Sequence, residues 1–442
     1  MAKTVAICTL GCKVNSYESA AVIEQFEKNG YTQVDFDSVS DIYIINTCTV
    51  THLSSRKSRQ MIRRAKQINP DAVLVVMGCY AQTEPEAVSK IPEVDLILGT
   101  ADKGKTFDAV EKFLASEEKM CIVSDISKKT EYDELFVTSY EGKTRAFLKV
   151  QDGCNNFCSY CIIPYARGRI RSRNFENSIE EAKRLSENGY TEIVLTGIHL
   201  ASYGKETGGP YLIDLISELN KIDKITRIRM GSLEPTVFDD EFTEKISKLP
   251  KVCHHFHLSL QSGCDETLLR MNRKYKTKDY EDAVNRIRCA MPDSAITTDI
   301  LTGFPGETDE EFEKTFAFAQ KIQFSDAHVF KYSIRKGTKA EKMENQIPPE
   351  VKEKRSQKLI KLTSETKKEF ILSHKGKTVD VLFEQWHNGK TNAFGKEAGV
   401  FEGKTDNYIT VLIKTDENLS GKTYPVTITG EENGFAIGEI AD

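Results

Sequence analysis

Long hydrophobic runs are missing from this 442-residue chain, in which no stretch approaches the roughly 18 consecutive apolar residues of a membrane-spanning helix. The first residues, MAKTVAICTL, also lack the apolar run and the small-residue cleavage site of a signal peptide. Hydrophobic residues make up 39% of the chain and charged residues 29%, which is ordinary for a globular protein. We therefore expect a cytoplasmic protein that does not contact a membrane.

A strong net charge is missing as well. The formal charge is only −5 at pH 7, so any nucleic-acid binding has to depend on local basic patches. Two such patches occur, RKSRQMIRRAK at residues 56–66 and a run of four arginines at residues 167–173. A charge run is often only a solvated helix face, and the first patch taken alone fits that interpretation equally well.

Cysteine, in contrast, is plentiful, with eleven residues in the chain. Because cytosolic thiols are kept reduced, a scaffold of disulfides is a poor explanation for so many cysteines. Clustered cysteines in such a protein indicate metal ligation or redox chemistry instead.

The first hundred residues alternate between apolar strand patterns and helical patterns. The strands are expected at residues 3–10, 41–46, 71–78 and 94–100, and this alternation predicts a doubly wound parallel sheet. Asn15 and Glu18 suggest a capping box for the first helix. One cysteine follows each of the first three strands: Cys12, Cys48 and Cys79. Ligands of such sheets bind beyond the carboxyl ends of the strands, so the three thiols could converge there.

Six further strand–helix units between residues 145 and 333 favour a partial (β/α)6 barrel, whose functional loops lie at the carboxyl ends of its strands. A long charged helix follows at residues 347–374. The last 65 or so residues alternate in short strands with glycine turns, which is typical of a small all-β barrel comparable to an oligonucleotide-binding (OB) module. The predicted domains are 1–138, 139–372 and 373–442.

The segment DGCNNFCSYCIIPYARGRIRSR holds Cys154, Cys158 and Cys161 in a C-x₃-C-x₂-C pattern, directly after the first barrel strand. Three thiolates so close can hold three irons of a [4Fe–4S] cube and leave the fourth iron without a protein ligand. A structural zinc site needs a fourth protein ligand, and the nearest histidine, His199, is far along the sequence. A non-enzymatic iron–sulfur electron carrier or sensor is the alternative of a different class.

With Tyr160 before its last cysteine, this motif resembles that of the radical S-adenosylmethionine superfamily. The resemblance implies that the amino and carboxylate groups of S-adenosylmethionine bind the open iron. It also implies that reduction cleaves the sulfonium to a 5′-deoxyadenosyl radical, which abstracts a hydrogen atom from an unactivated carbon.

The segments TLGCKVNSYES, NTCTVT and GCYAQ narrow the resemblance to the methylthiotransferases, over essentially the whole chain. This family implies a second [4Fe–4S] cluster on Cys12, Cys48 and Cys79, where a sulfur atom is bound and methylated. It further implies two uses of S-adenosylmethionine, a TRAM-like C-terminal barrel, and an electron donor and a sulfur donor as partners. The expected substrate is an adenine C2 in the anticodon loop of tRNA.

TLGCKVN is similar to the MtaB-like subgroup, which acts on N6-threonylcarbamoyladenosine at tRNA position 37. The subgroup for isopentenyladenosine more often reads GCQMN, and the subgroup for a ribosomal-protein aspartate differs at Lys13 and Val14. Both substrates remain alternatives. Cobalamin-dependent radical enzymes have a similar outline, but the D-x-H-x-x-G stretch of a cobalamin ligand is missing.

Tyr160 is predicted to bind the cofactor. Five further residues end barrel strands and are also predicted to bind it, with a structural role in their loops as the alternative: Gly197, Ser232, Glu234, Gln261 and Asp299. The four arginines of the second basic patch alternate along the chain, so that an extended conformation would place them on one face: Arg167, Arg169, Arg171 and Arg173. They are predicted to hold anticodon-loop phosphates, or else to anchor cofactor and structure. Residues 375–442 have seven Lys, no Arg and eleven Asp plus Glu, which gives a charge of −4. This charge predicts that the C-terminal barrel binds RNA weakly.

Overall fold

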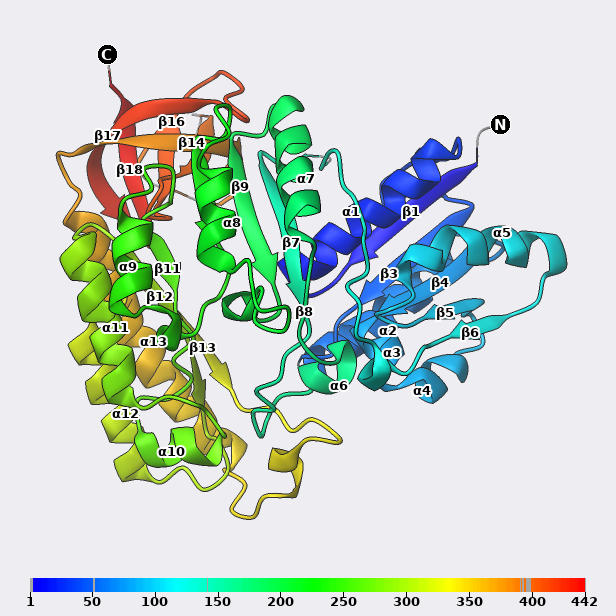
Figure 1. The fold of residues 1–442 in the computed structure, drawn as a ribbon, viewed down its shortest axis with the longest axis horizontal. Coiled ribbons are helices and arrows are strands. Elements are labelled where there is room, and N and C mark those ends of the chain that lie inside the picture. The colour runs from blue at the N-terminus through cyan, green and yellow to red at the C-terminus, as the bar shows by residue number, and fades with distance from the viewer. Residues whose placement is uncertain are drawn as a thin grey trace.

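The computed structural model describes residues 3–50, 52–140, 142–389, 391, 393–394 and 399–441. Its N-terminal part is a parallel six-stranded sheet in the order β2-β1-β3-β4-β5-β6, which confirms the predicted doubly wound sheet (Figure 1). The strands are β1 (Thr4–Thr9), β2 (Thr32–Gln33), β3 (Ile42–Thr47), β4 (Val73–Gly78), β5 (Leu96–Leu98) and β6 (Met120–Ile122).

Helices cover both faces of this sheet. On one face lie α1 (Lys13–Lys28) and α5 (Thr106–Ser116), and on the other lie α2 (His52–Ile68), α3 (Cys79–Thr83) and α4 (Pro85–Ser89). Because both faces are covered, the central strands β3 and β4 are buried along their full length, which explains their continuous apolar sequences.

The predicted capping box of α1 is wrong. The helix begins earlier, at Lys13, with Cys12 as its N-cap and no side-chain cap. Asn15 donates instead to the carbonyl oxygens of Leu10 and Thr47, at 2.6 and 3.1 Å. Glu18 is fully buried among cations, so neither side chain is available to the start of the helix.

The middle of the chain forms a partial barrel from two sheets, β10-β9-β7-β8 and β11-β12-β13. Isolated bridges between residues 228 and 252 and between residues 233 and 258 join the two sheets. The six predicted strands are confirmed as β7 (Arg145–Asp152), β9 (Glu192–Gly197), β10 (Arg227–Met230), β11 (His255–His257), β12 (Ala295–Thr302) and β13 (Asp326–Lys331). A two-residue antiparallel strand, β8 (Arg171–Ser172), extends the first sheet.

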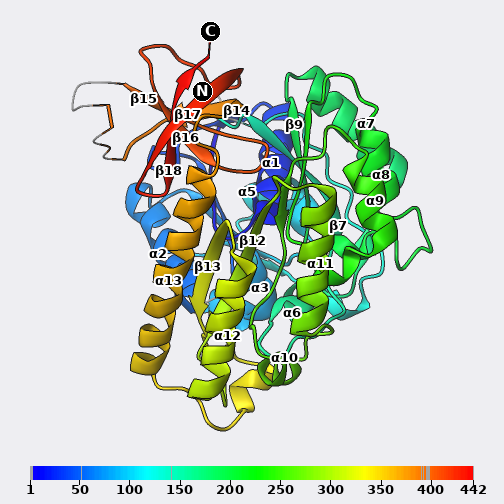
Figure 2. The ribbon, with the colours of Figure 1, turned by 90° about the vertical axis from the view of Figure 1, so that its left-hand side faces the viewer.

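Helices cover the outside of this barrel (Figure 2). They are α7 (Phe175–Glu187), α8 (Leu212–Leu219), α9 (Asp240–Ser247), α10 (Asp265–Arg270), α11 (Thr277–Ala290) and α12 (Asp309–Ile322), and α6 (Ile163–Arg167) follows the cysteine motif. Alternate strand residues such as Ala146, Leu148 and Ile193 join the main hydrophobic core beneath these helices. Their neighbours Arg145 and Glu192 therefore lie on the inner face of the barrel.

The C-terminal part begins with α13 (Pro349–Leu372) and ends in a small closed barrel, and both elements were predicted. The strand order of the barrel is β14-β15-β16-β18-β17. Its strands are β14 (Thr378–Trp386), β15 (Val400–Lys404), β16 (Thr410–Lys414), β17 (Thr423–Glu432) and β18 (Phe435–Ile440). This barrel lies over the starting ends of β7 and β9 (Figure 1). Its likeness to a TRAM domain and the three domain boundaries stay predictions.

Arg227 and Arg229, both on β10, attach the small barrel to the large one. Arg227 donates to the carbonyl oxygens of Lys404 and Asp380, and Arg229 to those of Asp406 and Thr405, at 2.7 to 3.2 Å. Among the helices in the described part of the chain, none is both long and apolar enough to cross a membrane.

Candidate active site

The first cysteine triad lies at the carboxyl edge of the N-terminal sheet. Cys12 is the N-cap of α1 just after β1, Cys48 follows the last residue of β3, and Cys79 follows the last residue of β4. Since β1, β3 and β4 are parallel neighbours, the three loops meet. The thiols of Cys12 and Cys48 each interact electrostatically with that of Cys79, as the strand pattern predicts for converging side chains.

Gly11 explains how the loops come this close. Its φ of 106° is in the left-handed region, and a Cβ atom built there would stand 2.9 Å from Cβ and 3.0 Å from Sγ of Cys48. A side chain at this position would push the two loops apart. Burial raises the pKa of both Cys12 and Cys48, although Arg167 opposes this for Cys12.

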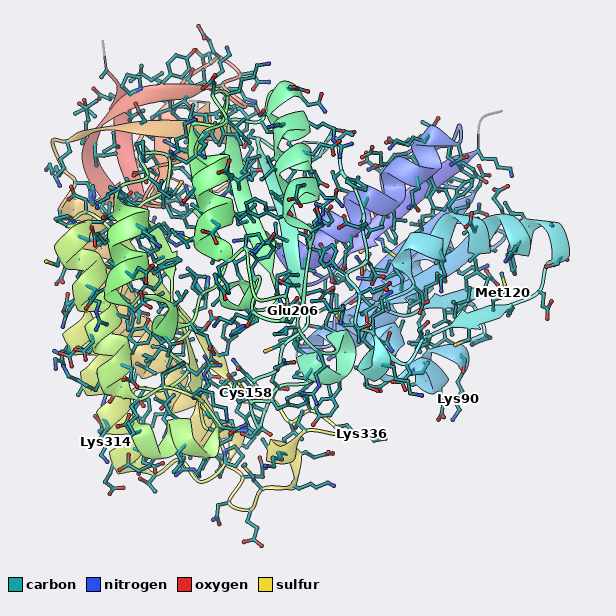
Figure 3. The ribbon with its side chains drawn as sticks, in the orientation of Figure 1. Lys90, Met120, Cys158, Glu206, Lys314 and Lys336 are labelled. Carbon is teal, nitrogen blue, oxygen red and sulfur yellow. The ribbon has the colours of Figure 1, made fainter. Side chains whose placement is uncertain are left out.

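The second triad lies on the loop between β7 and α6. Its middle member, Cys158, is labelled in Figure 3. The N–H of Cys154 donates to the carbonyl of Gly168 at 3.0 Å, and that of Cys161 to the carbonyl of Cys158 at 2.9 Å. Burial raises the pKa of Cys154 to about 11 and that of Cys161 to about 12. Gly153 is required here, because a Cβ atom would stand 1.8 Å from the carbonyl oxygen of Arg169.

Three polar side chains beside this triad were not predicted as site residues from the sequence: Asn156, His199 and Arg273. Arg273, just before α11, donates to Sγ of Cys158 at 3.3 Å and lies 3.1 Å from Glu234. Asn156 donates to Glu234 at 2.8 Å, and Nε2 of His199 lies 3.1 Å from the same carboxylate. Burial works against ionisation of Glu234, but His199 and Arg273 outweigh it and lower its pKa to about 2.

Of the residues predicted to bind the cofactor, Glu234 thus lies beside the Cys154 triad. Gly197 is close to Gln151, whose Cβ would stand 3.0 Å from a Cβ built on the glycine. That contact is a packing reason for a glycine here, and its role in cofactor binding stays a prediction. Ser232 is exposed at the end of β10.

Gln261 has a φ of 67° and is joined to β12 through both of its backbone groups. Asp299 lies on β12, with its carboxylate 3.4 Å from Nε2 of His257. Tyr160 packs against a small apolar cluster that includes Phe304. A role in cofactor binding stays a prediction for each of these residues.

The phosphate-binding prediction for Arg167 conflicts with its complete burial. It ends α6, and its guanidinium lies 2.5 Å from Glu18, 2.6 Å from Asn15 and 3.1 Å from Asp152. Lys149 joins both carboxylates, at 2.8 Å from Glu18 and 2.7 Å from Asp152. A side chain committed to these partners cannot reach a phosphate.

Arg171 and Arg173 are also buried, so the prediction that they contact phosphates directly is wrong for them too. Arg171 donates to the carbonyl oxygens of Arg167 and Arg169, and Arg173 pairs with Glu181 at 2.7 Å. The four arginines do not share one extended strand, because α6 ends at the first of them. Only Arg169 is exposed, with its guanidinium 4.6 Å from the ring centroid of Phe157.

The buried ion cluster, which we define as Glu18, Lys103, Lys149, Asp152 and Arg167, joins the two triads. It has three cations and two carboxylates. Nε of Arg167 is buried without a hydrogen-bond partner, and this guanidinium interacts electrostatically with the thiols of Cys12 and Cys79. The surplus positive charge and the unused donor fit a negatively charged, thiolate-bound iron–sulfur cluster at the first triad.

Within the described ranges, no three His, Cys, Asp or Glu side chains are close enough to share a single metal ion.

Comparison with known proteins gives two family matches. Residues 4–99 match the uncharacterized protein family UPF0004, and residues 148–319 match the radical SAM superfamily. The chain is 42% identical to the threonylcarbamoyladenosine tRNA methylthiotransferase MtaB of Bacillus subtilis (strain 168), over 96% of this chain and 93% of that protein. It is 37% identical to the tRNA-2-methylthio-N(6)-dimethylallyladenosine synthase of Acetivibrio thermocellus, over 99% of this chain and 91% of that protein.

Among solved structures, the radical S-adenosylmethionine methyltransferase TsrM from Kitasatospora setae has a TM-score of 0.55 at 13% identity, covering 75% of this chain and 73% of that one. This likeness shows the fold alone. Identity above 30% over nearly full lengths shows the family, which uses S-adenosylmethionine and a [4Fe–4S] cluster. The chain therefore belongs to the methylthiotransferases of the radical S-adenosylmethionine superfamily, and it is an enzyme.

Proposed function

We propose that this enzyme replaces the hydrogen on C2 of N6-threonylcarbamoyladenosine in tRNA with a methylthio group, at position 37 of the anticodon loop. The observation that carries this proposal is the near full-length similarity to proteins named for that reaction in three bacteria, at 36 to 42% identity. The sequence TLGCKVN around Cys12 supports the same substrate.

In this proposal the two cysteine triads have different roles. Cys154, Cys158 and Cys161 hold the cluster at which S-adenosylmethionine is reduced, and Cys12, Cys48 and Cys79 hold a second [4Fe–4S] cluster that carries the sulfur. An electron donor and a sulfur donor are therefore required as partners.

The chain's own polar groups support each centre. Beside the Cys154 triad, the guanidinium of Arg273 donates to Sγ of Cys158 and pairs with Glu234, which fixes the orientation of both groups. Beside the Cys12 triad, Arg167 stabilises the negative charge of thiolates. Arg167 comes six residues after Cys161 and contacts Glu18 on α1. It therefore also fixes the position of the two cysteine triads relative to each other.

The substrate is tested by comparing nucleosides from digested tRNA of a strain with and without this gene, using mass spectrometry. We expect the 2-methylthio derivative of N6-threonylcarbamoyladenosine to disappear from the deletion strain and its unmodified precursor to accumulate. Loss of the methylthio derivative of dimethylallyladenosine instead would assign the chain to that substrate, which is named for relatives at 33 to 37% identity.

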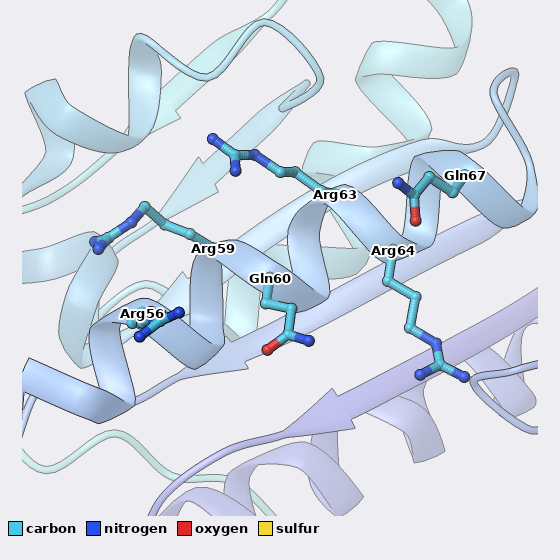
Figure 4. Close-up of a pocket in the computed structure, with 6 residues that line it drawn as sticks. All are labelled: Arg56, Arg59, Gln60, Arg63, Arg64 and Gln67. Carbon is cyan, nitrogen blue, oxygen red and sulfur yellow. The ribbon is translucent and has the colours of Figure 1, made fainter.

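RNA contact is proposed for the exposed face of α2. This helix begins four residues after Cys48, and its side chains line a hollow of about 600 Å³ (Figure 4): Arg56, Arg59, Gln60, Arg63, Arg64 and Gln67. Arg64 pairs with Asp37 at 2.8 Å, and Arg59 is half-buried against Tyr80. Arg56 and Arg63 are exposed and form no ion pair with any described residue, which leaves both guanidinium groups free for phosphates.

We expect the double variant Arg56→Gln/Arg63→Gln to bind tRNA more weakly than wild type and with a smaller dependence on salt. Each lost phosphate contact lowers the slope of log K against log salt by about 0.7 to 0.9, so the slope should fall by about 1.5. Fluorescence anisotropy over a salt series measures this. The control is Lys90→Gln/Lys112→Gln, which removes two exposed charges elsewhere on the same domain; an equal slope change in that control would mean that α2 has no special role.

A further inference from the structure

The three parts of the chain meet around Tyr408, on the loop between β15 and β16 of the C-terminal barrel. Its ring stacks on the imidazole of His255, the first residue of β11, with centroids 4.5 Å apart and planes 16° from parallel. Its φ of 70° lies in the left-handed region, which a bulky residue adopts only when its surroundings hold it there. The tyrosine is therefore held at the starting ends of the barrel strands.

Cations surround this ring on the inner face of the barrel. The guanidinium groups of Arg229 and Arg145 lie 4.8 and 5.5 Å from the ring centroid, and the ammonium of Lys404 lies 4.4 Å from it. Two carboxylates face the same region. Glu192 pairs with Arg229 at 2.6 Å, and Glu384 pairs with Arg145 at 2.6 Å.

Two further cations raise the positive charge of this region. Arg227 lies 3.7 Å from Glu192, and Lys13 interacts electrostatically with Tyr408, Arg145, Arg229 and Glu192. The carboxylate of Asp406 is half-exposed and lies 4.0 Å from His254 instead. Five cations thus share two carboxylates. An anionic ligand stabilises such an excess of positive charge.

Lys13 is the member of this group with no hydrogen bond or ion pair to any described residue. It directly follows Cys12 and is the first residue of α1, so its side chain extends past the start of the helix. Lys13 is exposed, so its side chain is accessible from solvent. It is a lysine with no partner among the described residues, next to this group of cations, so it is available to bind an anionic ligand.

We propose that the ammonium of Lys13, together with the hydroxyl of Tyr408, binds the carboxylate of the threonylcarbamoyl group on the substrate base. This inference rests on the proposed function and deepens it, because it names the group by which the substrate is selected. A threonylcarbamoyl group has a free carboxylate, whereas a dimethylallyl group has no charge. The subsite therefore discriminates between the substrates named for the two kinds of relative.

The place of Lys13 agrees with this role. In an adenine ring, C2 and the carbon that bears N6 are both bonded to N1. When the group on N6 is bound by one residue, C2 therefore stays close to that residue. Lys13 adjoins Cys12 in the chain. Anchoring the carboxylate at Lys13 thus keeps C2 beside the triad proposed to carry the sulfur.

The test uses the full-length protein with both clusters assembled and three short anticodon stem-loop RNAs of one sequence. Position 37 is N6-threonylcarbamoyladenosine, its carboxylate methyl ester, or unmodified adenosine. We expect wild type to bind the first RNA about 10- to 100-fold more tightly than the ester, as measured by anisotropy. Lys13→Gln should reduce the affinity for the first RNA to that for the ester and leave the ester's affinity unchanged. Lys13→Arg should restore part of the difference, and Tyr408→Phe should have a smaller effect than Lys13→Gln.

Iron content and cluster absorbance are measured for every variant, so that a lost cluster is not mistaken for a lost contact. An equal loss of affinity for all three RNAs in Lys13→Gln would overturn the proposal and assign the lysine to a backbone phosphate. Equal affinities of wild type for the first RNA and its ester would also overturn it. If wild type still methylthiolates the first RNA in that case, the proposed function stands and only the subsite fails; if it does not, the substrate itself is wrong.

Discussion

Cys12→Ala should still cleave S-adenosylmethionine to 5′-deoxyadenosine under reduction, while methylthiolated RNA falls below detection. The reason is the separate origin of the two triads: Cys12 lies on the N-terminal sheet, whereas Cys154 lies on the loop after β7. Cys154→Ala should show the opposite pattern and form no 5′-deoxyadenosine. Chromatography of both products from the same reactions measures this, and each variant should retain about half of the wild-type iron.

The control for these variants is Cys289→Ala, since Cys289 is exposed on α11 and should leave both products and the iron content unchanged. Methylthiolated RNA from Cys12→Ala would contradict the role given to the first triad. Loss of 5′-deoxyadenosine in Cys12→Ala would show instead that the two centres depend on each other for assembly.

Arg167→Met should lower the free energy of unfolding by about 3–5 kcal/mol, because it leaves Glu18 and Asp152 buried with less compensating charge. Calorimetry should show the first unfolding transition at a clearly lower temperature. Arg64→Met is the matched control: it removes an arginine from an exposed ion pair with Asp37 at 2.8 Å, and such pairs contribute little to stability. A similar transition temperature for the two variants would mean that the buried ion cluster contributes no more than a surface pair.

The same cluster predicts a loss of stability in acid. Burial disfavours the charged form of Glu18, but Arg167, Lys103 and Lys149 outweigh burial and hold its pKa well below the usual 4.5. The stability that Glu18 contributes is thus present above about pH 4.5 and is lost as the pH falls below that value. We expect Glu18→Gln to be less stable than wild type at neutral pH and to lose less stability than wild type on acidification.

Much of the fold could be predicted from the sequence because its strands are short, apolar and separated by helices of regular spacing. The strands expected at 41–46 and 71–78 correspond to β3 and β4 almost to the residue. The convergence of Cys12, Cys48 and Cys79 followed from strand order alone, since parallel strands place their following loops at one edge. The short strand β8 was missed because two residues carry no periodic pattern.

The burial of the arginines could not be predicted from the sequence. Arg167, Arg171 and Arg173 look like a basic surface, but their carboxylate partners come from distant segments, such as Glu18 on α1 and Glu181 on α7. A single sequence does not show which acidic residues will lie opposite a cation. The same limit applies to His199, which is 38 residues from Cys161 in the chain yet lies 3.1 Å from both Asn156 and Glu234 beside the triad.

The attachment of the C-terminal barrel has a consequence for its sequence. Arg227 and Arg229 donate to backbone carbonyl oxygens of that barrel, and every residue type supplies such an acceptor. Many surface side chains of the barrel can therefore be substituted without loss of these hydrogen bonds. The same holds for its excess of acidic residues. Barrels taken from relatives should dock on this chain wherever the loop that bears Tyr408 keeps its shape.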